Sequence, residues 1–182
     1  MNIVNLITLG RLLASPVAIW LIINHEYTLA FWVFVLAGLS DAVDGFIAKR
    51  FNLETVFGKY LDPIADKVLL VSVYIALGQD GAIPAWLVIL VVFRDVIIVG
   101  GAILYHTITQ SLTIRPLMIS KVNTAAQVMF AGLVLCGHAY GFADHWAIGA
   151  LIYVVGATTL LSGGAYVVTW WRRAGAVSEV KK

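Results

Sequence analysis

The chain has 182 residues, of which 61% are hydrophobic and only 12% are charged. A water-soluble domain of this length buries about two-thirds of its surface and carries about a quarter charged residues, so the composition argues against a soluble globular protein. The formal net charge of +2 gives no reason to expect a nucleic-acid partner, and the single cysteine excludes an intrachain disulfide and a Cys-based zinc cluster.

Six apolar segments follow one another along the chain. Each approaches or exceeds the roughly 20 residues that a helix needs to cross a bilayer, and helices satisfy their own backbone groups in lipid. The segments are residues 6–23, 27–48, 61–78, 84–105, 117–136 and 145–171. We therefore predict an all-α integral membrane protein with six transmembrane helices. Residues 1–172 would form the membrane domain, and residues 173–182 a loose polar tail.

The positions of lysine and arginine predict the orientation of these helices. The connections at 24–28, 79–83 and 137–144 contain neither residue, whereas the alternate connections and the C-terminal end are basic. Because basic residues stay on the cytoplasmic side, we expect both termini to be cytoplasmic.

Four aspartates lie where the second and third segments approach the cytoplasmic side. Asp41 and Asp44 are three residues apart, and Asp62 and Asp66 are four apart, so each pair shares one helix face. Four carboxylates at a similar depth would repel one another unless cations neutralised them. Oxygen ligands of this kind favour two Mg²⁺ or Mn²⁺ ions. Pro63 either starts a helix capped by Asp62 or kinks a longer one.

An alternative is that these acids form structural salt bridges with Lys49, Lys59 and Lys67. Lysines near the end of a span, however, tend to extend toward the lipid headgroups. Gly45 and Gly58 lie beside the acids, and glycine there suggests a ligand that approaches the backbone closely.

The order and spacing of these aspartates and glycines resemble the signature of the CDP-alcohol phosphotransferase family. The matching positions are Asp41, Asp44, Gly45, Ala48, Gly58, Asp62 and Asp66. One position departs from the signature, because Lys49 stands where the family usually has arginine. Lysine keeps the charge but loses the bidentate fork, and the adjacent Arg50 could supply the contact.

The resemblance implies a six-helix enzyme of the bacterial inner membrane with its active site on the cytoplasmic side. Such an enzyme uses an alcohol to displace CMP from a CDP-linked lipid. Asp41, Asp44 and Asp62 would chiefly hold two Mg²⁺ or Mn²⁺ ions, and Asp66 would complete the ligand set and act as general base. The residues expected to bind the CDP group are Asn5, Thr8, Asp41, Gly45, Lys49 and Gly58.

The remaining polar residues of the apolar segments are candidates for the acceptor site. Arg94 and Asp95 lie midway along the fourth segment, and Arg115, Ser120 and Lys121 lie at the start of the fifth. Cations near a helix N-terminus suit a phosphate, so we expect Arg94, Arg115, Ser120 and Lys121 to bind an anionic acceptor. The alternatives are an internal ion pair with a neighbouring helix for Arg94 and Asp95, and ordinary cytoplasmic basic residues for the others.

The run from Ile119 to Ala125, Ile-Ser-Lys-Val-Asn-Thr-Ala, resembles one subgroup of the family, the mitochondrial and alphaproteobacterial type of cardiolipin synthase. The resemblance implies transfer of a phosphatidyl group from CDP-diacylglycerol to phosphatidylglycerol. The alternative is phosphatidylglycerolphosphate synthase, which uses glycerol 3-phosphate. A remote alternative from another class is an ion transporter.

Gly149, Gly156 and Gly163 recur every seven residues along the sixth segment. Such a seam of small residues permits close helix packing, either within the chain or between two copies. Because similar proteins are homodimers, we expect a homodimer.

Overall fold

A computed structural model describes four stretches of the chain: residues 3–51, 56–109, 118–143 and 146–180. Side chains are described for residues 8–41, 64–101, 118–143 and 146–169.

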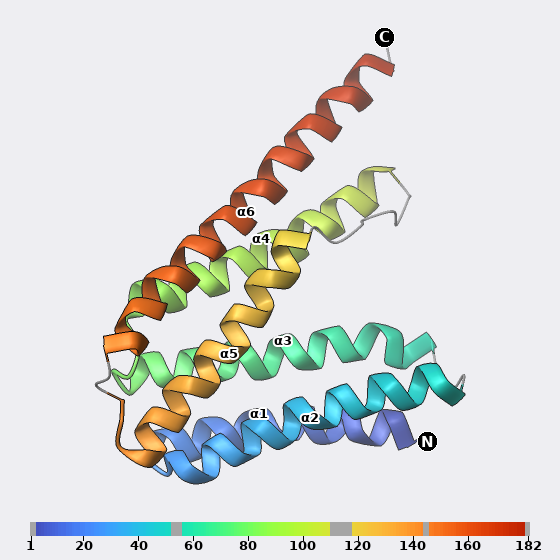
Figure 1. The fold of residues 1–182 in the computed structure, drawn as a ribbon. Helices are drawn as coiled ribbons and strands as arrows, with labels where there is room; N and C mark the ends of the chain where they lie inside the picture. Colours follow the sequence, from blue (N-terminus) through green and yellow to red (C-terminus); the bar gives the residue numbers. More distant parts are fainter. Residues whose placement is uncertain (1–2, 52–55, 110–117, 144–145, 181–182) are drawn as a thin grey trace.

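The described residues form helices joined by short turns (Figure 1), which confirms the predicted all-α class. The helices are α1 (Ile3–Ile23), α2 (Tyr27–Phe51), α3 (Val56–Gln79), α4 (Ala85–Thr109), α5 (Met118–Tyr140) and α6 (Trp146–Val180). Each of the six apolar segments of the sequence corresponds to one helix. Crossing of a membrane by all six stays a prediction.

Helices α2 and α3 extend further toward each other than the hydropathy pattern indicated. Helix α2 continues to Phe51 and α3 begins at Val56, so Asp62 and Pro63 both lie inside α3 and Asp62 is not its cap. Helix α6 also continues to Val180, so the predicted tail is helical over most of its length instead of loose. Hydropathy reports where a helix becomes polar, and a helix does not have to end there.

The helices pack in two groups that α5 connects. Helix α1 packs against α2 and α3, α4 packs against α6 and α3, and α5 contacts α2, α3 and α6 (Figure 1). The core between them is aliphatic and aromatic, and its largest fully buried side chains include Tyr74, Phe130, Ile22 and Leu77. The Tyr74 hydroxyl donates to the backbone carbonyl of Gln127 at 3.1 Å, so its polar group is satisfied inside this core.

The two ends of the bundle differ in character. Both chain termini lie on the same side of the molecule, together with the C-terminal ends of α2 and α4 (Figure 1). At the opposite end, Tyr27 donates a hydrogen bond to Asp80, and His25 Nδ1 lies 3.0 Å from Asp80 Oδ1. His138 stacks on Tyr27 with ring centroids 4.7 Å apart. This cluster ties the start of α2 to the α3–α4 turn and the end of α5.

The outer surface of the helices is strongly apolar. Exposed large side chains occur on every helix, and they include Trp20, Leu36, Ile89, Met129 and Trp146. An apolar surface this extensive is typical of contact with lipid or with another protein. Among the described residues, Met118–Tyr140 and Trp146–Thr169 are long and apolar enough to cross a membrane, and Thr8–Ile23 and Tyr27–Asp41 are shorter apolar helices.

The glycine seam of α6 faces α4 at two of its three positions. A Cβ atom at Gly156 would lie 2.9 Å from Trp86 Cζ3, and one at Gly163 would lie 3.6 Å from Arg94 Cγ. A Cβ atom at Gly149 would meet nothing within 4 Å. Gly156 therefore permits close packing inside the chain, and the expected homodimer stays a prediction.

Candidate active site

Two of the four aspartates face each other across a buried arginine. Arg11 Nη1 donates to Asp41 Oδ1 at 2.5 Å and also to Asp66 Oδ1. These side chains come from α1, α2 and α3, so one guanidinium joins three helices. Carboxylates from two helices thus converge on a single positive charge.

The exposure of these groups shows on which side a ligand would approach. The Arg11 side chain is 1% exposed, whereas those of Asp41 and Asp66 are each 43% exposed. All three line a cavity of about 270 Å³, together with Lys67 on α3 and Thr124 on α5. The guanidinium therefore lies behind the carboxylates, and the carboxylates face the cavity.

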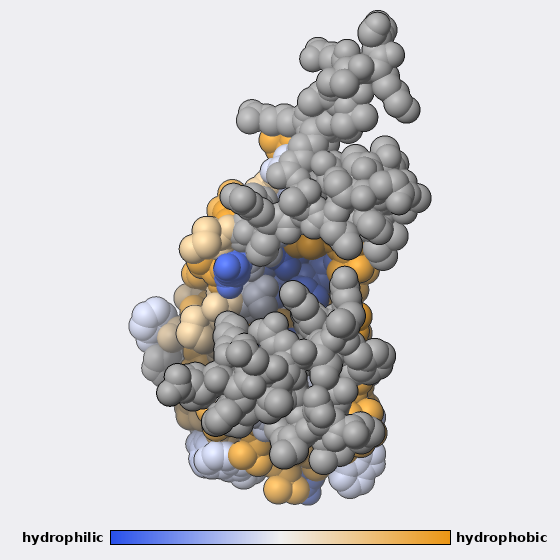
Figure 2. All heavy atoms as spheres, turned by 90° about the vertical axis from the view of Figure 1, so that its right-hand side faces the viewer, coloured by the Kyte–Doolittle hydropathy of each residue, from blue (hydrophilic) through white to orange (hydrophobic). Residues whose placement is uncertain are grey.

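The cavity lies toward the end of the bundle that carries the termini. Seen from that end, Figure 2 shows hydrophilic residues gathered in a hollow, with hydrophobic residues along the sides of the molecule. The helices explain this arrangement, because α1 has apolar residues nearly throughout, and a buried guanidinium there is stable only beside acids.

Most of the other predicted site residues lie outside the described side chains. This holds for Asn5, Asp44, Gly45, Lys49, Gly58, Asp62 and Arg115, whose predicted roles stay predictions. Thr8 is described and is fully buried one helical turn before Arg11 on α1. Of the four aspartates, the structure thus shows the positions of Asp41 and Asp66.

Arg94 lies in a buried polar network. Its Nη1 donates to Asp95 Oδ1 at 2.6 Å, and its Nη2 donates to Ser120 Oγ at 2.5 Å and to Ser162 Oγ at 2.7 Å. The Arg94 side chain is 2% exposed and lies outside the lining of the cavity. Arg94 thus pairs with the adjacent Asp95 on its own helix, and its bonds to the two serines join α4 to α5 and α6. Its predicted contact with an acceptor stays a prediction.

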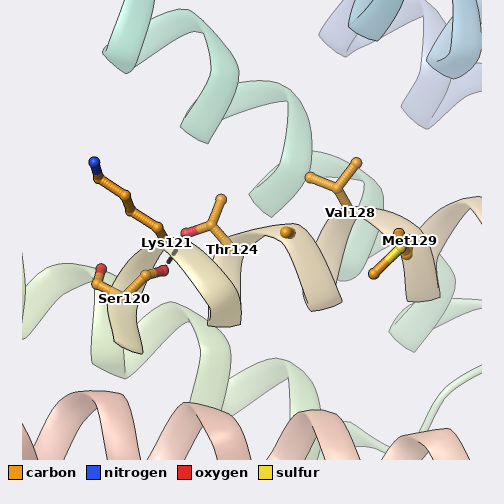
Figure 3. Close-up of a pocket in the computed structure, with 6 residues that line it drawn as sticks. Ser120, Lys121, Thr124, Val128 and Met129 are labelled. Carbon is orange, nitrogen blue, oxygen red and sulfur yellow. Dashed lines mark hydrogen bonds between the residues drawn. The ribbon is translucent and has the colours of Figure 1, made fainter. Parts of the chain in front are cut away.

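Ser120 and Lys121 line a second, open groove of about 560 Å³ on α5, together with Val128 and Met129. Thr124 and Val128 also line the cavity beside Asp41 and Asp66, so groove and cavity adjoin. Figure 3 shows the Lys121 side chain extending away from the helix at one end, whereas Val128 and Met129 make the other end apolar.

The residues present fit a divalent cation. Asp41 and Asp66 offer hard oxygen donors that already converge on one positive nitrogen, as they would have to converge on Mg²⁺ or Mn²⁺. No cluster of three potential ligands occurs among the described side chains, and Asp44 and Asp62 lie outside them. A full ligand set for two ions therefore stays a prediction.

Two residues of this site were missed by sequence reasoning. Arg11 is the only charged residue of α1. An isolated ionisable group in an apolar helix often has a function, so the sequence alone could have indicated Arg11 as a site residue. The sequence suggested Lys67 only as a structural salt-bridge partner of the four aspartates. In the structure its Nζ donates to Asp95 Oδ1 at 2.7 Å.

The comparisons with known proteins identify the family of this chain. A family model described as CDP-alcohol phosphatidyltransferase matches residues 1–171. The chain therefore belongs to the CDP-alcohol phosphatidyltransferase family, as its aspartate signature indicated.

Curated relatives in this family carry two kinds of names. The CDP-diacylglycerol–glycerol-3-phosphate 3-phosphatidyltransferase 1 of Oryza sativa chloroplasts is 35% identical over 93% of this chain and 57% of its own length. A probable CMP-forming cardiolipin synthase of Drosophila melanogaster is 33% identical over 92% of the chain and 57% of its own length. The CDP-diacylglycerol–glycerol-3-phosphate 3-phosphatidyltransferase of Bacillus subtilis is 31% identical over 76% of the chain and 72% of its own length. The chain thus spans a little over half the length of the first two relatives.

Proposed function

We propose that this protein is a CMP-forming cardiolipin synthase that transfers the phosphatidyl group of CDP-diacylglycerol to phosphatidylglycerol. Family membership supports a CDP-alcohol phosphatidyltransferase activity, and several relatives are named cardiolipin synthases. The observation that carries the choice of acceptor is the run Ile119–Ala125, which contributes Ser120 and Lys121 to the groove beside the cavity.

The chemistry assigns distinct tasks to the residues of the cavity. When bound by Asp41, Asp44, Asp62 and Asp66, Mg²⁺ or Mn²⁺ would neutralise the diphosphate and stabilise the departing CMP. Asp66 accepts the proton of the acceptor hydroxyl, because its carboxylate faces the cavity. The freed oxygen forms a bond to the phosphorus of the phosphatidyl group while the bond from that phosphorus to CMP breaks. Thr8, with Asn5, Gly45, Lys49 and Gly58, holds the cytidine diphosphate in this proposal.

The apolar groove on α5 supports a lipid acceptor. Its Val128 and Met129 suit an acyl chain, and Ser120 and Lys121 lie at its polar end. Phosphatidylglycerol carries acyl chains beside its phosphate, whereas glycerol 3-phosphate carries none. The rice and Bacillus relatives named for glycerol 3-phosphate favour phosphatidylglycerolphosphate synthase as the second candidate.

A product assay tests the proposal. The purified protein is given CDP-diacylglycerol and Mg²⁺ or Mn²⁺ with either phosphatidylglycerol or glycerol 3-phosphate, and the lipid formed is identified by mass spectrometry while CMP is quantified. We expect cardiolipin and an equal amount of CMP with phosphatidylglycerol, and no turnover in EDTA. The Asp66→Asn variant serves as control and should form neither product. Phosphatidylglycerolphosphate as the product would instead support the second candidate.

A further inference from the structure

Lys67 occupies a distinctive position in the cavity. It follows Asp66 in α3, yet its ammonium does not pair with that carboxylate: Nζ donates to Asp95 Oδ1 on α4 at 2.7 Å. The Lys67 side chain is 33% exposed and lines the same cavity as Asp41 and Asp66. A cation is therefore held beside the predicted general base, paired with a carboxylate of another helix.

The network around Lys67 carries more positive than negative charge. Asp95 Oδ1 accepts from both Lys67 and Arg94, so two cations share one carboxylate. Arg94 and Asp95 are 2% and 8% exposed at their side chains, and the other partners of Arg94 are the neutral Ser120 and Ser162. Of these charged groups, only Lys67 reaches the cavity, so the surplus positive charge is presented there.

The cavity is therefore bipolar. Asp41 and Asp66, with Arg11 behind them, offer negative charge on the side of α1 and α2, and Lys67 offers positive charge on the side of α4. A divalent cation suits the first side. A phosphate suits the second, because a lysine ammonium is a compact point charge that binds phosphate oxygens strongly.

We propose that Lys67, held in place by the Asp95–Arg94 ion pair, binds the phosphate of the acceptor beside Asp66. Two phosphates enter this reaction, that of the acceptor and the diphosphate of the CDP-lipid. The acceptor is the better fit, because Lys67 is fixed toward α4, whereas Thr8, expected to bind the nucleotide, lies on α1. Asp95 and Arg94 act in this proposal as positioning residues.

The proposal rests on the proposed function, since it requires an acceptor that carries a phosphate. The two are tested separately. The proposed function fails if the wild-type protein makes a lipid other than cardiolipin. The role of Lys67 is then measured with whichever phosphate-bearing acceptor the wild-type protein uses.

Steady-state kinetics of Lys67→Met test the proposal, with KM determined separately for the acceptor and for CDP-diacylglycerol. Loss of one charge-assisted hydrogen bond is expected to raise the acceptor KM by about tenfold or more, with the KM for CDP-diacylglycerol changed less than about twofold. Lys67→Arg should restore most of the acceptor KM. Asp95→Asn should give an intermediate acceptor KM, because it removes the group that fixes the ammonium. Lys181→Met is the matched control and should change neither constant.

A chemical rescue separates binding from folding. In a Cys136→Ala background, Lys67→Cys is purified and then alkylated with bromoethylamine, which restores an ammonium to a protein that has already folded. We expect the acceptor KM to fall back toward the wild-type value after alkylation. A rise in the KM for CDP-diacylglycerol in Lys67→Met would overturn the proposal in favour of the donor diphosphate. If both KM values of Lys67→Met equal those of the wild-type protein, or if kcat falls and alkylation does not restore it, Lys67 does not bind the acceptor and has only a structural role.

Discussion

Arg11 shows how one side chain can organise a site before any ligand enters. Its guanidinium is buried, and Asp41 and Asp66 approach it from α2 and α3 and compensate its charge. A buried cation is costly without such partners, and the partners would repel each other without the cation. The three residues therefore stabilise one another, and Arg11 keeps the two carboxylates close together.

We predict that Arg11→Gln lowers the melting temperature measured in EDTA by several degrees. The free energy of unfolding should fall by about 2 kcal/mol. This is less than the roughly 3–5 kcal/mol lost when a fully buried ion pair is broken, since both carboxylates are partly exposed. Mn²⁺ should stabilise this variant more than the wild-type protein, because a competing positive charge has gone. Arg11→Lys keeps the charge and serves as the control. An unchanged melting temperature in EDTA would show that Arg11 does not hold the carboxylates together.

The sequence predicted those site residues that are recognisable from their spacing along the chain. The four aspartates stand out because two pairs lie one helical turn apart in apolar segments, and Asp41 and Asp66 do meet in the structure. The pairing of Lys67 with Asp95 joins residues 28 positions apart on different helices. No periodicity encodes such a contact, because it depends on how α3 and α4 are rotated against each other.

At the scale of the helices, the contact between α4 and α6 depends on the absence of a side chain at Gly156. Trp86 packs where a Cβ atom at this position would lie, at 2.9 Å from Cζ3. Hydrophobic attraction between helices is absent in lipid, so close packing of this kind is a principal source of helix association there. The same contact keeps α4 in place, and α4 carries the Arg94–Asp95 pair that holds Lys67.

Gly156→Ala and Gly149→Ala form a matched pair on α6. Alanine stabilises a helix relative to glycine by about 1 kcal/mol, and Gly149 has room for it. At Gly156 the new methyl group should displace Trp86, and overpacking costs about 1–3 kcal/mol. We therefore expect a lower melting temperature for Gly156→Ala than for Gly149→Ala, with the oligomeric state unchanged in light scattering. Equal melting temperatures would contradict the packing of Trp86 against Gly156 inside the chain.

The sequence predicted the number and order of the helices better than their ends. Each apolar segment corresponds to a helix, the element in which a single apolar run satisfies its own backbone groups. Helix α3 nevertheless begins at Val56, ahead of the predicted residue 61, and contains Pro63. The start of α3 includes polar residues, and the composition of a window cannot distinguish a polar helical turn from a connection.

Among the described residues, two polar clusters lie toward opposite ends of the bundle. The cavity lined by Asp41, Asp66 and Lys67 lies toward the end that carries both chain termini (Figures 1 and 2), and the His25, Tyr27 and Asp80 cluster lies at the other. With the termini in the cytoplasm, as the basic residues predict, the cavity would open near the inner leaflet, where the proposed lipid substrates can reach it.

Labelling of single cysteines tests this orientation. In a Cys136→Ala background, Asn24→Cys marks the α1–α2 turn and Ser178→Cys marks the end of α6. A membrane-impermeant maleimide added to spheroplasts should label Asn24→Cys alone, because the distribution of lysine and arginine puts this turn outside. In inverted vesicles the same reagent should label Ser178→Cys alone. Detergent-solubilised samples, in which both cysteines should react, control for their intrinsic reactivity. The predicted arrangement requires α1 and α6 to end on opposite faces of the membrane. Labelling of both positions from one side of an intact membrane would therefore rule it out.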